Sequence, residues 1–166
     1  MDTLFIRRSV RKYLDKPVEG EKIERILRAA MQAPSATDQR PWEFLVITEK
    51  PKVEFLANFS PYAKLLKGAP AAIIVLEKTM VRAPSFSEQD LGACAENLLL
   101  QVVDEGLGAV WMGVGKGSTR ERFIKDMFRL PGKVRPFAVI ALGYPEDENA
   151  NKFVDRYDES RVHYNK

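Results

Sequence analysis

Four cationic side chains lie close together near the start of the chain. The run RRSVRK at residues 7–12 contains three arginines, a lysine and the hydroxyl of Ser9. Arginine presents a planar fork of N–H donors that matches a phosphate group, and a serine hydroxyl adds one donor. Elsewhere the two signs of charge are interleaved, so the net charge of +3 and the pI near 9.0 do not indicate a nucleic-acid surface. The cluster predicts a site for one phosphomonoester, or else an ordinary solvated surface.

A polar loop with two prolines is the second candidate. The segment APSATDQRPW at residues 33–42 has no helical or strand periodicity, and it lies between a predicted helix and a predicted strand. The prolines restrict its backbone, and the side chains between them offer many hydrogen bonds. Dense polar chemistry on a stiffened loop suits recognition of a planar heterocycle, although an ordinary helix-to-strand connection fits this segment equally well.

The third candidate is a glycine-rich segment, GLGAVWMGVGKG, at residues 106–117. Its five glycines allow a ligand to approach the backbone closely. The segment does not fit G-x-G-x-x-G, because Trp111 and Ser118 stand where glycines are needed, nor a P-loop, because Gly117 follows Lys116. A Rossmann domain and a P-loop NTPase are therefore disfavoured.

The sequence lacks the usual motifs for acid–base or nucleophilic chemistry. It contains neither H-E-x-x-H nor G-x-S-x-G, and its one histidine, His163, has no second histidine with which to build a metal site. The one cysteine, Cys94, excludes an internal disulfide and lies in an apolar helical pattern, where we expect a small buried hydrophobe. We therefore predict no metal, and expect the reactivity to belong to a bound cofactor.

Helical and strand patterns alternate around these segments. Apolar residues that recur every three or four positions predict helices at residues 20–32, 88–105 and 119–128. Short apolar runs, several of them β-branched, predict buried strands at residues 44–47, 71–76, 109–112 and 137–142. Weaker helical patterns cover residues 52–58 and 62–66.

Three details refine this outline. The predicted helix at residues 88–105 is apolar on more than one side, which indicates burial by more than its own subunit. Ser118 and Glu121 have the spacing of a capping box at the start of the next helix. After Glu146 the chain is polar with scattered aromatic residues, so residues 147–166 are expected to form an arm that cannot fold alone.

Length and composition predict one globular domain over residues 1–166. The chain is of the usual single-domain size, with 45% hydrophobic and 30% charged residues. No apolar run approaches the roughly 20 residues that cross a bilayer. The N-terminus lacks the basic and apolar stretches of a secretory leader. We therefore expect a cytoplasmic protein with no membrane partner.

Taken in order along the chain, the candidate segments resemble motifs of the nitroreductase family. Residues 7–13, RRSVRKY, resemble R-R-S-[IV]-R-x-[FY], and residues 33–42 resemble A-P-S-x-x-N-x-Q-P-W. The run DLGACAENLLL at residues 90–100, followed by GLGAVW at residues 106–111, resembles the long central helix and the glycine-containing strand of that family. Each motif alone is weak, but together they cover nearly the whole chain in family order.

The resemblance implies an α+β fold, with a mixed, largely antiparallel sheet of about four strands flanked by helices. It also implies a homodimer in which the arm of residues 147–166 crosses to the partner subunit. Alternating helices and strands would by themselves suggest a parallel doubly wound sheet. The family resemblance favours the antiparallel arrangement instead.

The same resemblance implies an enzyme that binds FMN, takes hydride from NAD(P)H and passes it to a nitroaromatic, quinone or similar small acceptor. The chemistry would occur at flavin N5, with no catalytic side chain. The phosphate and ribityl chain would be bound by Arg7, Arg8, Ser9 and Arg156. The ring would be contacted by Arg11 near N1 and O2, and by backbone N–H groups near Met112, Gly113 and Val114 at N5 and O4. The other subunit would contribute Pro34, Ser35 and Asp38.

Two departures from the family pattern leave alternatives open. Asp38 and Arg40 stand where the family usually has Asn and Gln, so Asp38 either contacts the flavin or pairs with Arg40 or another arginine. Little sequence lies between Thr79 and Ser87 to build a lid over a substrate. The alternatives are a relative that uses its flavin for dehalogenation or flavin fragmentation, and a flavin-binding or nucleic-acid-binding module without turnover.

Overall fold

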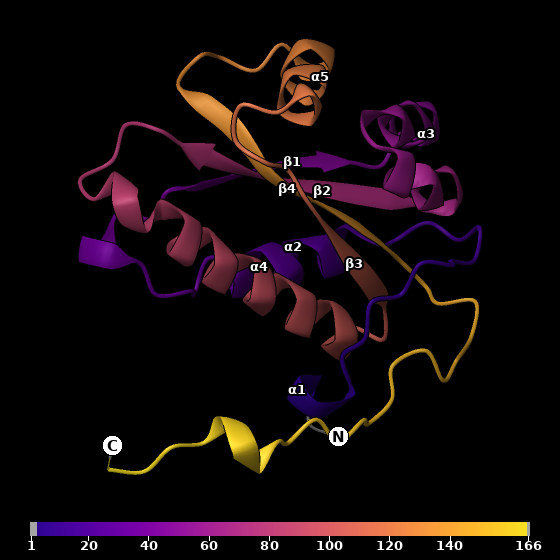
Figure 1. Cartoon of the computed structure of the whole chain (residues 1–166). Coiled ribbons are helices and arrows are strands. Elements are labelled where there is room, and N and C mark those ends of the chain that lie inside the picture. The colour runs from indigo at the N-terminus through magenta and orange to yellow at the C-terminus, as the bar shows by residue number, and fades with distance from the viewer. Residues whose placement is uncertain (1–2, 166) are drawn as a thin grey trace.

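The core of the protein is one antiparallel sheet of four strands. The computed structural model describes residues 3–165, with the strand order β1-β2-β4-β3 (Figure 1). The strands are β1 (Trp42–Ile47), β2 (Ala71–Lys78), β3 (Gly108–Gly113) and β4 (Val134–Gly143). All three strand pairings are antiparallel, and an isolated parallel bridge joins Ser9 to Ala109. The predicted α+β fold is confirmed, and the parallel doubly wound alternative is excluded.

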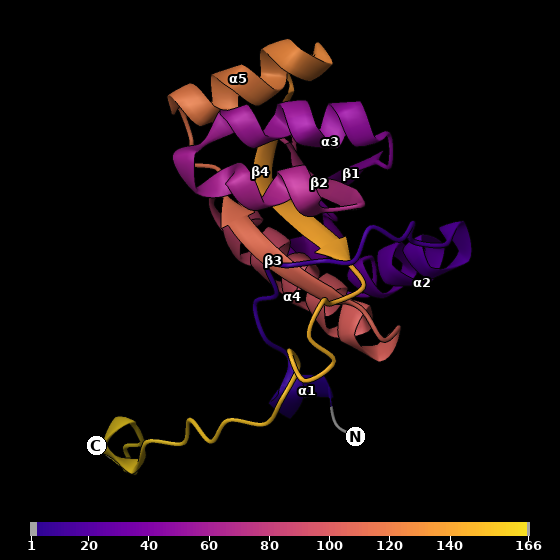
Figure 2. The same cartoon turned by 90° about the vertical axis from the view of Figure 1, so that its right-hand side faces the viewer.

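Helices cover both faces of this sheet. α2 (Gly20–Ala30) and α4 (Ser87–Asp104) pack on one face, whereas α3 (Lys50–Leu56), η3 (Pro61–Gly68) and α5 (Thr119–Phe128) pack on the other (Figure 2). Five shorter helical segments complete the described chain: α1 (Thr3–Ile6), η1 (Ala36–Asp38), η2 (Ala57–Phe59), η4 (Pro84–Phe86) and η5 (Glu159–Arg161). Because helices cover both faces, β2 is buried along almost its whole length, which explains why its sequence is a continuous apolar run.

β4 begins earlier than its apolar run predicts. The prediction placed this strand at residues 137–142, whereas β4 starts at Val134. Pro136 argues against a central strand, because proline cannot donate a hydrogen bond to the ladder. The strand tolerates it because the register between β2 and β4 shifts at this point, and because β3 ends before reaching it.

α5 starts with a capping arrangement that differs by one residue from the prediction. Ser118 Oγ accepts the backbone N–H of Glu121 at 3.2 Å, as predicted. The carboxylate of Glu121 accepts the N–H of Gly117 at 2.6 Å, and not that of Ser118. Gly117 adopts a φ of 71°, which glycine permits, and this turn brings its N–H to the carboxylate.

α4 is largely buried within its own chain. Cys94 and Leu98 are fully buried in the core between α4, α2 and the sheet. Cys94 is therefore the buried hydrophobe that the sequence predicts, and burial raises the pKa of its thiol to about 12. The positions of α4 that stay half-exposed, Ala93 and Leu100 among them, are where burial by a second subunit remains a prediction. No helix among residues 3–165 is both long and apolar enough to cross a bilayer.

The segment that carries the N-terminal arginines is fixed against β3. Val10 is buried, and its N–H donates to the carbonyl of Ala109 at 2.9 Å. A Cβ atom on Gly108 would lie 2.6 Å from Val10 Cγ2, so only glycine fits there. These contacts set the positions of Ser9 and Arg11 on either side of Val10.

The C-terminal arm extends away from the body of the molecule (Figures 1 and 2). Asn151 anchors its base, accepting the N–H of Arg8 at 3.2 Å and donating to the carbonyl of Leu107 at 2.9 Å. Beyond this point the arm is exposed, including 73% of Tyr157 and 78% of Tyr164. The described chain leaves these aromatic rings uncovered, and the exchange of the arm between subunits remains a prediction.

Candidate functional site

The predicted phosphate-binding residues are held individually by the fold. Arg7 Nε lies 3.1 Å from Glu96 Oε1 on α4. Arg8 donates from its two terminal nitrogens to the carbonyls of Arg7 and Phe5. Its Nε is buried and has no hydrogen-bond partner in the described chain. Ser9 lies beside them, in the bridge to β3.

Arg156 of the arm comes close enough to Arg8 to affect its ionisation. Partial desolvation, together with the positive charges of Arg156 and Arg7, lowers the pKa of Arg8 from its ordinary value. Among residues 3–165, no acid forms an ion pair with Arg8 or Arg156. Crowded cations with an unused N–H donor favour a bound anion. This arrangement fits the phosphate of FMN.

A cavity of about 360 Å³ lies at the open edge of β3. It brings together three of the predicted ring-binding residues, Arg11, Met112 and Gly113. Its lining also includes residues that sequence reasoning did not assign to a site: Phe59, Ser60, Tyr62, Trp111 and Arg120. The lining therefore holds two guanidinium groups and three aromatic rings but no carboxylate, a composition suited to a planar ligand that carries negative charge.

The backbone donors at this edge can be distinguished from one another. The N–H of Val114 donates to the carbonyl of Phe137 at 2.9 Å, so it is already engaged. Gly113 and Ala138 are paired in the antiparallel ladder. Since donors alternate in direction along an antiparallel strand, the N–H of Gly113 points to the open edge and that of Met112 toward β4. Of the three backbone groups predicted to face the flavin, Gly113 offers the available donor.

The proline-containing loop has an unusual backbone. Thr37, Asp38 and Arg40 have φ values of 53°, 55° and 44°, in the left-handed region that non-glycine residues rarely adopt. Each such residue costs roughly 1–3 kcal/mol and persists only where surrounding contacts fix it. Asp38 forms an ion pair with Arg40 at 2.6 Å, one of the two alternatives left open by the sequence. Ser35 Oγ accepts the N–H of Arg40 at 3.0 Å, and Pro34 is exposed.

Asp90 in the first turn of α4 holds this loop in place. Its buried carboxylate accepts the N–H of Ala36 at 2.9 Å and the side-chain amide of Gln39 at 2.6 Å. Gln39 also exchanges hydrogen bonds with the N–H and carbonyl of Ala83. The segment before α4 and the start of α4 together determine the conformation of the loop.

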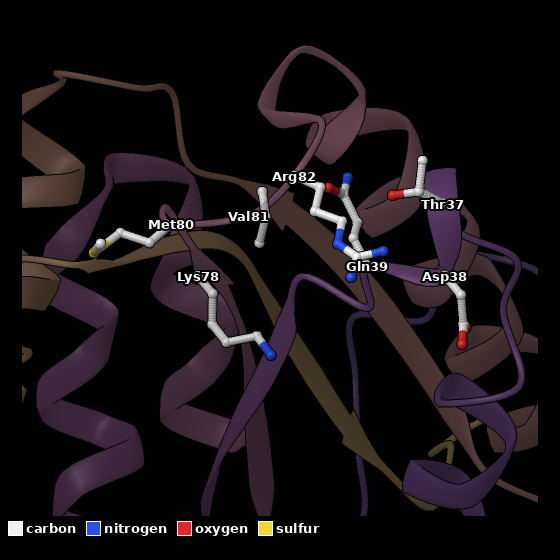
Figure 3. A pocket seen from close by; sticks show the side chains of 7 residues that line it. All are labelled: Thr37, Asp38, Gln39, Lys78, Met80, Val81 and Arg82. Atoms are coloured by element: carbon white, nitrogen blue, oxygen red, sulfur yellow. The ribbon is translucent and has the colours of Figure 1, made fainter.

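A second and wider cavity, of about 910 Å³, lies beside the loop (Figure 3). The side chains of Lys78 and Arg82 extend into it, whereas the carboxylate of Asp38 points away. None of the residues that line this cavity lines the 360 Å³ cavity at β3. Within the described chain, Asp38 therefore lines a different cavity from Arg11 and Gly113.

Sequence reasoning missed Asp90, Arg120 and Asn151. Arg120 carried a usable signal, because a cation in the first turn of a helix opposes the helix dipole. Asp90 and Asn151 carried none, since their roles depend on contacts with distant segments. In the described residues, no group of three or more His, Cys, Asp or Glu side chains is arranged to hold a metal ion.

Comparison with known proteins identifies the family. The model of the Nitroreductase family matches residues 5–65 and 52–144. The chain belongs to the nitroreductase family. A protein of Methanothermobacter thermautotrophicus named "Putative NADH dehydrogenase/NAD(P)H nitroreductase" is 40% identical over 100% of this chain and 86% of its own length.

Solved structures agree with the family assignment. An "FMN-dependent Nitroreductase" from Clostridium difficile superposes with a TM-score of 0.90 and 31% identity, covering 99% of this chain and 98% of that chain. A "putative nitroreductase in complex with fmn" from Desulfovibrio desulfuricans has a TM-score of 0.82 and 27% identity, covering 99% and 94%. This family member therefore shares its fold with proteins described as FMN-dependent or FMN-bound.

Proposed function

We propose that this protein is a cytoplasmic, FMN-dependent oxidoreductase that takes hydride from NAD(P)H and delivers it to a nitroaromatic, quinone or similar small acceptor. The buried Nε of Arg8, which has no hydrogen-bond partner in the described chain, and the cavity that contains Arg11, Arg120 and Gly113 together carry the proposal. The names of the relatives from Methanothermobacter and Clostridium difficile support it. FMN supplies hydride and electron transfer at its N5 atom, and the protein supplies binding, orientation and electrostatics.

The N-terminal segment and the arm would hold the phosphate end of FMN. The unused Nε of Arg8 would donate to a phosphate oxygen, and Arg156 would add positive charge from the arm. Ser9 contributes its hydroxyl toward the ribityl chain. Because Asn151 ties the base of the arm to Arg8, binding of the phosphate and placement of the arm are coupled.

The cavity at β3 would hold the pyrimidine side of the flavin ring. Arg11 places a cation near N1 and O2, where it favours the negative charge that accompanies reduction. Gly113 would direct its backbone N–H from the open edge of β3 toward N5 and O4, beside Met112, which also lines the cavity. The N–H of Val114 is bound to the carbonyl of Phe137, so this residue would support the strand and not contact the ring. These groups orient the ring and need not transfer protons.

A second copy of the chain would complete the site. The loop with Pro34, Ser35 and Asp38 contributes no residue to the cavity that contains Arg11, which supports its contact with the flavin of a partner subunit. The uncovered aromatic residues of the arm provide a surface for that partner. We therefore include the homodimer and the exchanged arm in the proposal.

The deciding experiment is purification without added flavin, followed by titration of the flavin-free protein with FMN. We expect a yellow protein, or tight FMN binding on titration, and anaerobic bleaching of the flavin by NADH or NADPH. A protein that binds no FMN would overturn the proposal. FMN binding without reduction by either nucleotide would instead indicate a flavin-binding module.

The acceptor is then identified by turnover. Steady-state assays with nitroaromatics and quinones, compared with halophenols and with oxygen-dependent loss of the flavin, distinguish reductase chemistry from dehalogenation and flavin fragmentation. Faster turnover with nitro compounds or quinones is the expected result.

A further inference from the structure

Arg120 lines the same cavity as Arg11 but is not among the residues proposed above to bind FMN. It occupies the first turn of α5 and is half-buried. Its guanidinium carbon lies 5.8 Å from the ring centroid of Tyr62, which itself lines the cavity. The side chain is therefore positioned at the wall of the cavity by an aromatic contact.

The position of Arg120 is electrostatically unfavourable in the described chain. The N-terminal end of a helix carries partial positive charge, so a cation in the first turn is repelled. No acid among residues 3–165 forms an ion pair with Arg120. Arg11, the other guanidinium of the cavity, is likewise without an ion pair there. Two uncompensated cations at one cavity indicate that its occupant supplies negative charge.

We propose that Arg120 is a second cation of the flavin site. Its side chain binds the reduced ring of FMN more strongly than the oxidised ring. This inference rests on the proposed function and assigns a role that Arg11 alone does not fill. The two-electron-reduced ring carries negative charge that the oxidised ring lacks, so a nearby cation stabilises the reduced state selectively. A residue that only shaped the cavity would affect both states equally.

The test compares the affinities of the two redox states. Fluorescence titration gives the dissociation constant of oxidised FMN, and spectroelectrochemical titration gives the midpoint potential of bound FMN. The two values together give the affinity for reduced FMN. The quantity compared is the ratio of the affinity for reduced FMN to the affinity for oxidised FMN. A tenfold change in this ratio shifts a two-electron potential by about 30 mV. For Arg120→Gln we expect the ratio to fall roughly three- to tenfold, a shift of about 15–30 mV to more negative potential.

Two further variants provide controls. Arg120→Lys keeps the charge and should retain most of the wild-type ratio. Arg122→Gln removes an equal charge from the same helix at an exposed position outside this cavity, and should leave the ratio unchanged.

The outcomes separate this inference from the proposed function. Equal losses of affinity for both redox states in Arg120→Gln, or an unchanged ratio, would overturn the role of Arg120 while leaving FMN binding intact. A wild-type protein that binds no FMN would overturn the proposed function itself.

Discussion

At the scale of single residues, the site depends on close contacts that fix the N-terminal segment. Val10 is packed so tightly against Gly108 that no Cβ atom fits between them. Ser9 and Arg11 flank Val10 in the sequence, so their positions follow from this contact. Val10, which has no chemical role of its own, thus positions the side chains of Ser9 and Arg11.

Gly108→Ala tests this dependence. The added methyl group would displace Val10, and we expect FMN affinity to fall at least about tenfold and stability by roughly 1–3 kcal/mol, the usual cost of overpacking. FMN titration and urea denaturation measure the two effects. Val10→Ala in the same chain should recover part of both losses, whereas Gly20→Ala, which has open space around the new methyl group, should change neither. Full FMN affinity in Gly108→Ala would show that the contact does not position the site.

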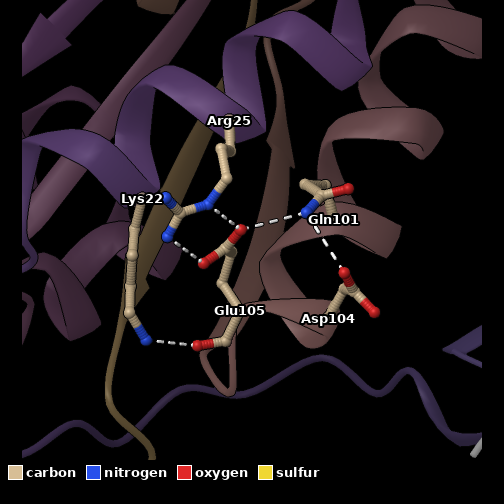
Figure 4. A network of polar contacts seen from close by, with 5 residues as sticks. All are labelled: Lys22, Arg25, Gln101, Asp104 and Glu105. Carbon is tan, nitrogen blue, oxygen red and sulfur yellow. Dashed lines mark hydrogen bonds and ion pairs between the residues drawn. The ribbon is translucent and has the colours of Figure 1, made fainter.

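At the scale of elements, α4 positions two parts of the molecule at once. Its first turn holds the strained loop through Asp90, and the residue that follows its end, Glu105, joins it to α2. Glu105 accepts hydrogen bonds from Arg25 at 2.7 and 2.8 Å and from Gln101 at 3.1 Å, and its carbonyl accepts one from Lys22 (Figure 4). Both ends of the helix are therefore fixed by carboxylates.

Asp90→Asn should release the loop. The amide cannot accept at both positions, so the bond to Gln39 or to Ala36 is lost, at a cost of about 1–3 kcal/mol for a buried group left unpaired. We expect faster amide hydrogen exchange over residues 35–40 and weaker FMN binding. Asp104→Asn makes the same exchange at the exposed end of α4 and serves as the control. Unchanged hydrogen exchange in Asp90→Asn would contradict this role.

Glu105→Gln should destabilise the protein in a pH-dependent way. The hydrogen bond from Arg25 is the main reason why the pKa of Glu105 is below its ordinary value. A carboxyl whose folded pKa is depressed contributes stability above its unfolded pKa, and that stability is lost as pH falls through the folded value. We expect a lower Tm for the variant at pH 7, and convergence with wild type as the pH falls below the ordinary glutamate pKa and through the lower folded value. A constant difference in Tm across this range would show that the charge is not the cause.

The sequence predicted the helices and strands better than their boundaries and the contacts between them. Apolar periodicity located the main helices and all four strands, because burial on the sheet dictates residue type there. It missed the start of β4 because Pro136 lies at a register shift that depends on β2. It also missed the buried ion pair of Glu77 and Arg135, which lie opposite each other on β2 and β4. Contacts between distant segments leave no periodic pattern in the chain.

At the scale of the whole molecule, the C-terminal arm is the part that packs least against the rest of the described chain. Beyond Asn151 and the ring contact of Phe153 with Phe5, its side chains contribute little to the core of the described chain. It nevertheless carries Arg156, which lies close to Arg8. Motif resemblance implied the arm exchange, whereas composition alone indicated only a segment that could not fold alone.

Removal of residues 153–166 should convert the protein from a dimer to a monomer. Light scattering should give twice the 18.8 kDa mass of one chain for the full-length protein and a single-chain mass for the truncated form. FMN binding should be lost in parallel. Arg156→Gln in the full chain should weaken FMN binding while leaving the dimer intact. A truncated protein that remains dimeric would contradict the proposed role of the arm.

The division of the site between two cavities has a consequence for mixtures of variants. In the proposed dimer each flavin draws on the N-terminal segment of one subunit and the loop of the other, so Gly108→Ala and Asp90→Asn damage opposite halves. A heterodimer of the two variants then has one site with both defects and one with none. Co-expression of the two variants should therefore give heterodimers in which one of the two sites binds FMN with wild-type affinity, whereas homodimers of either variant should contain no such site.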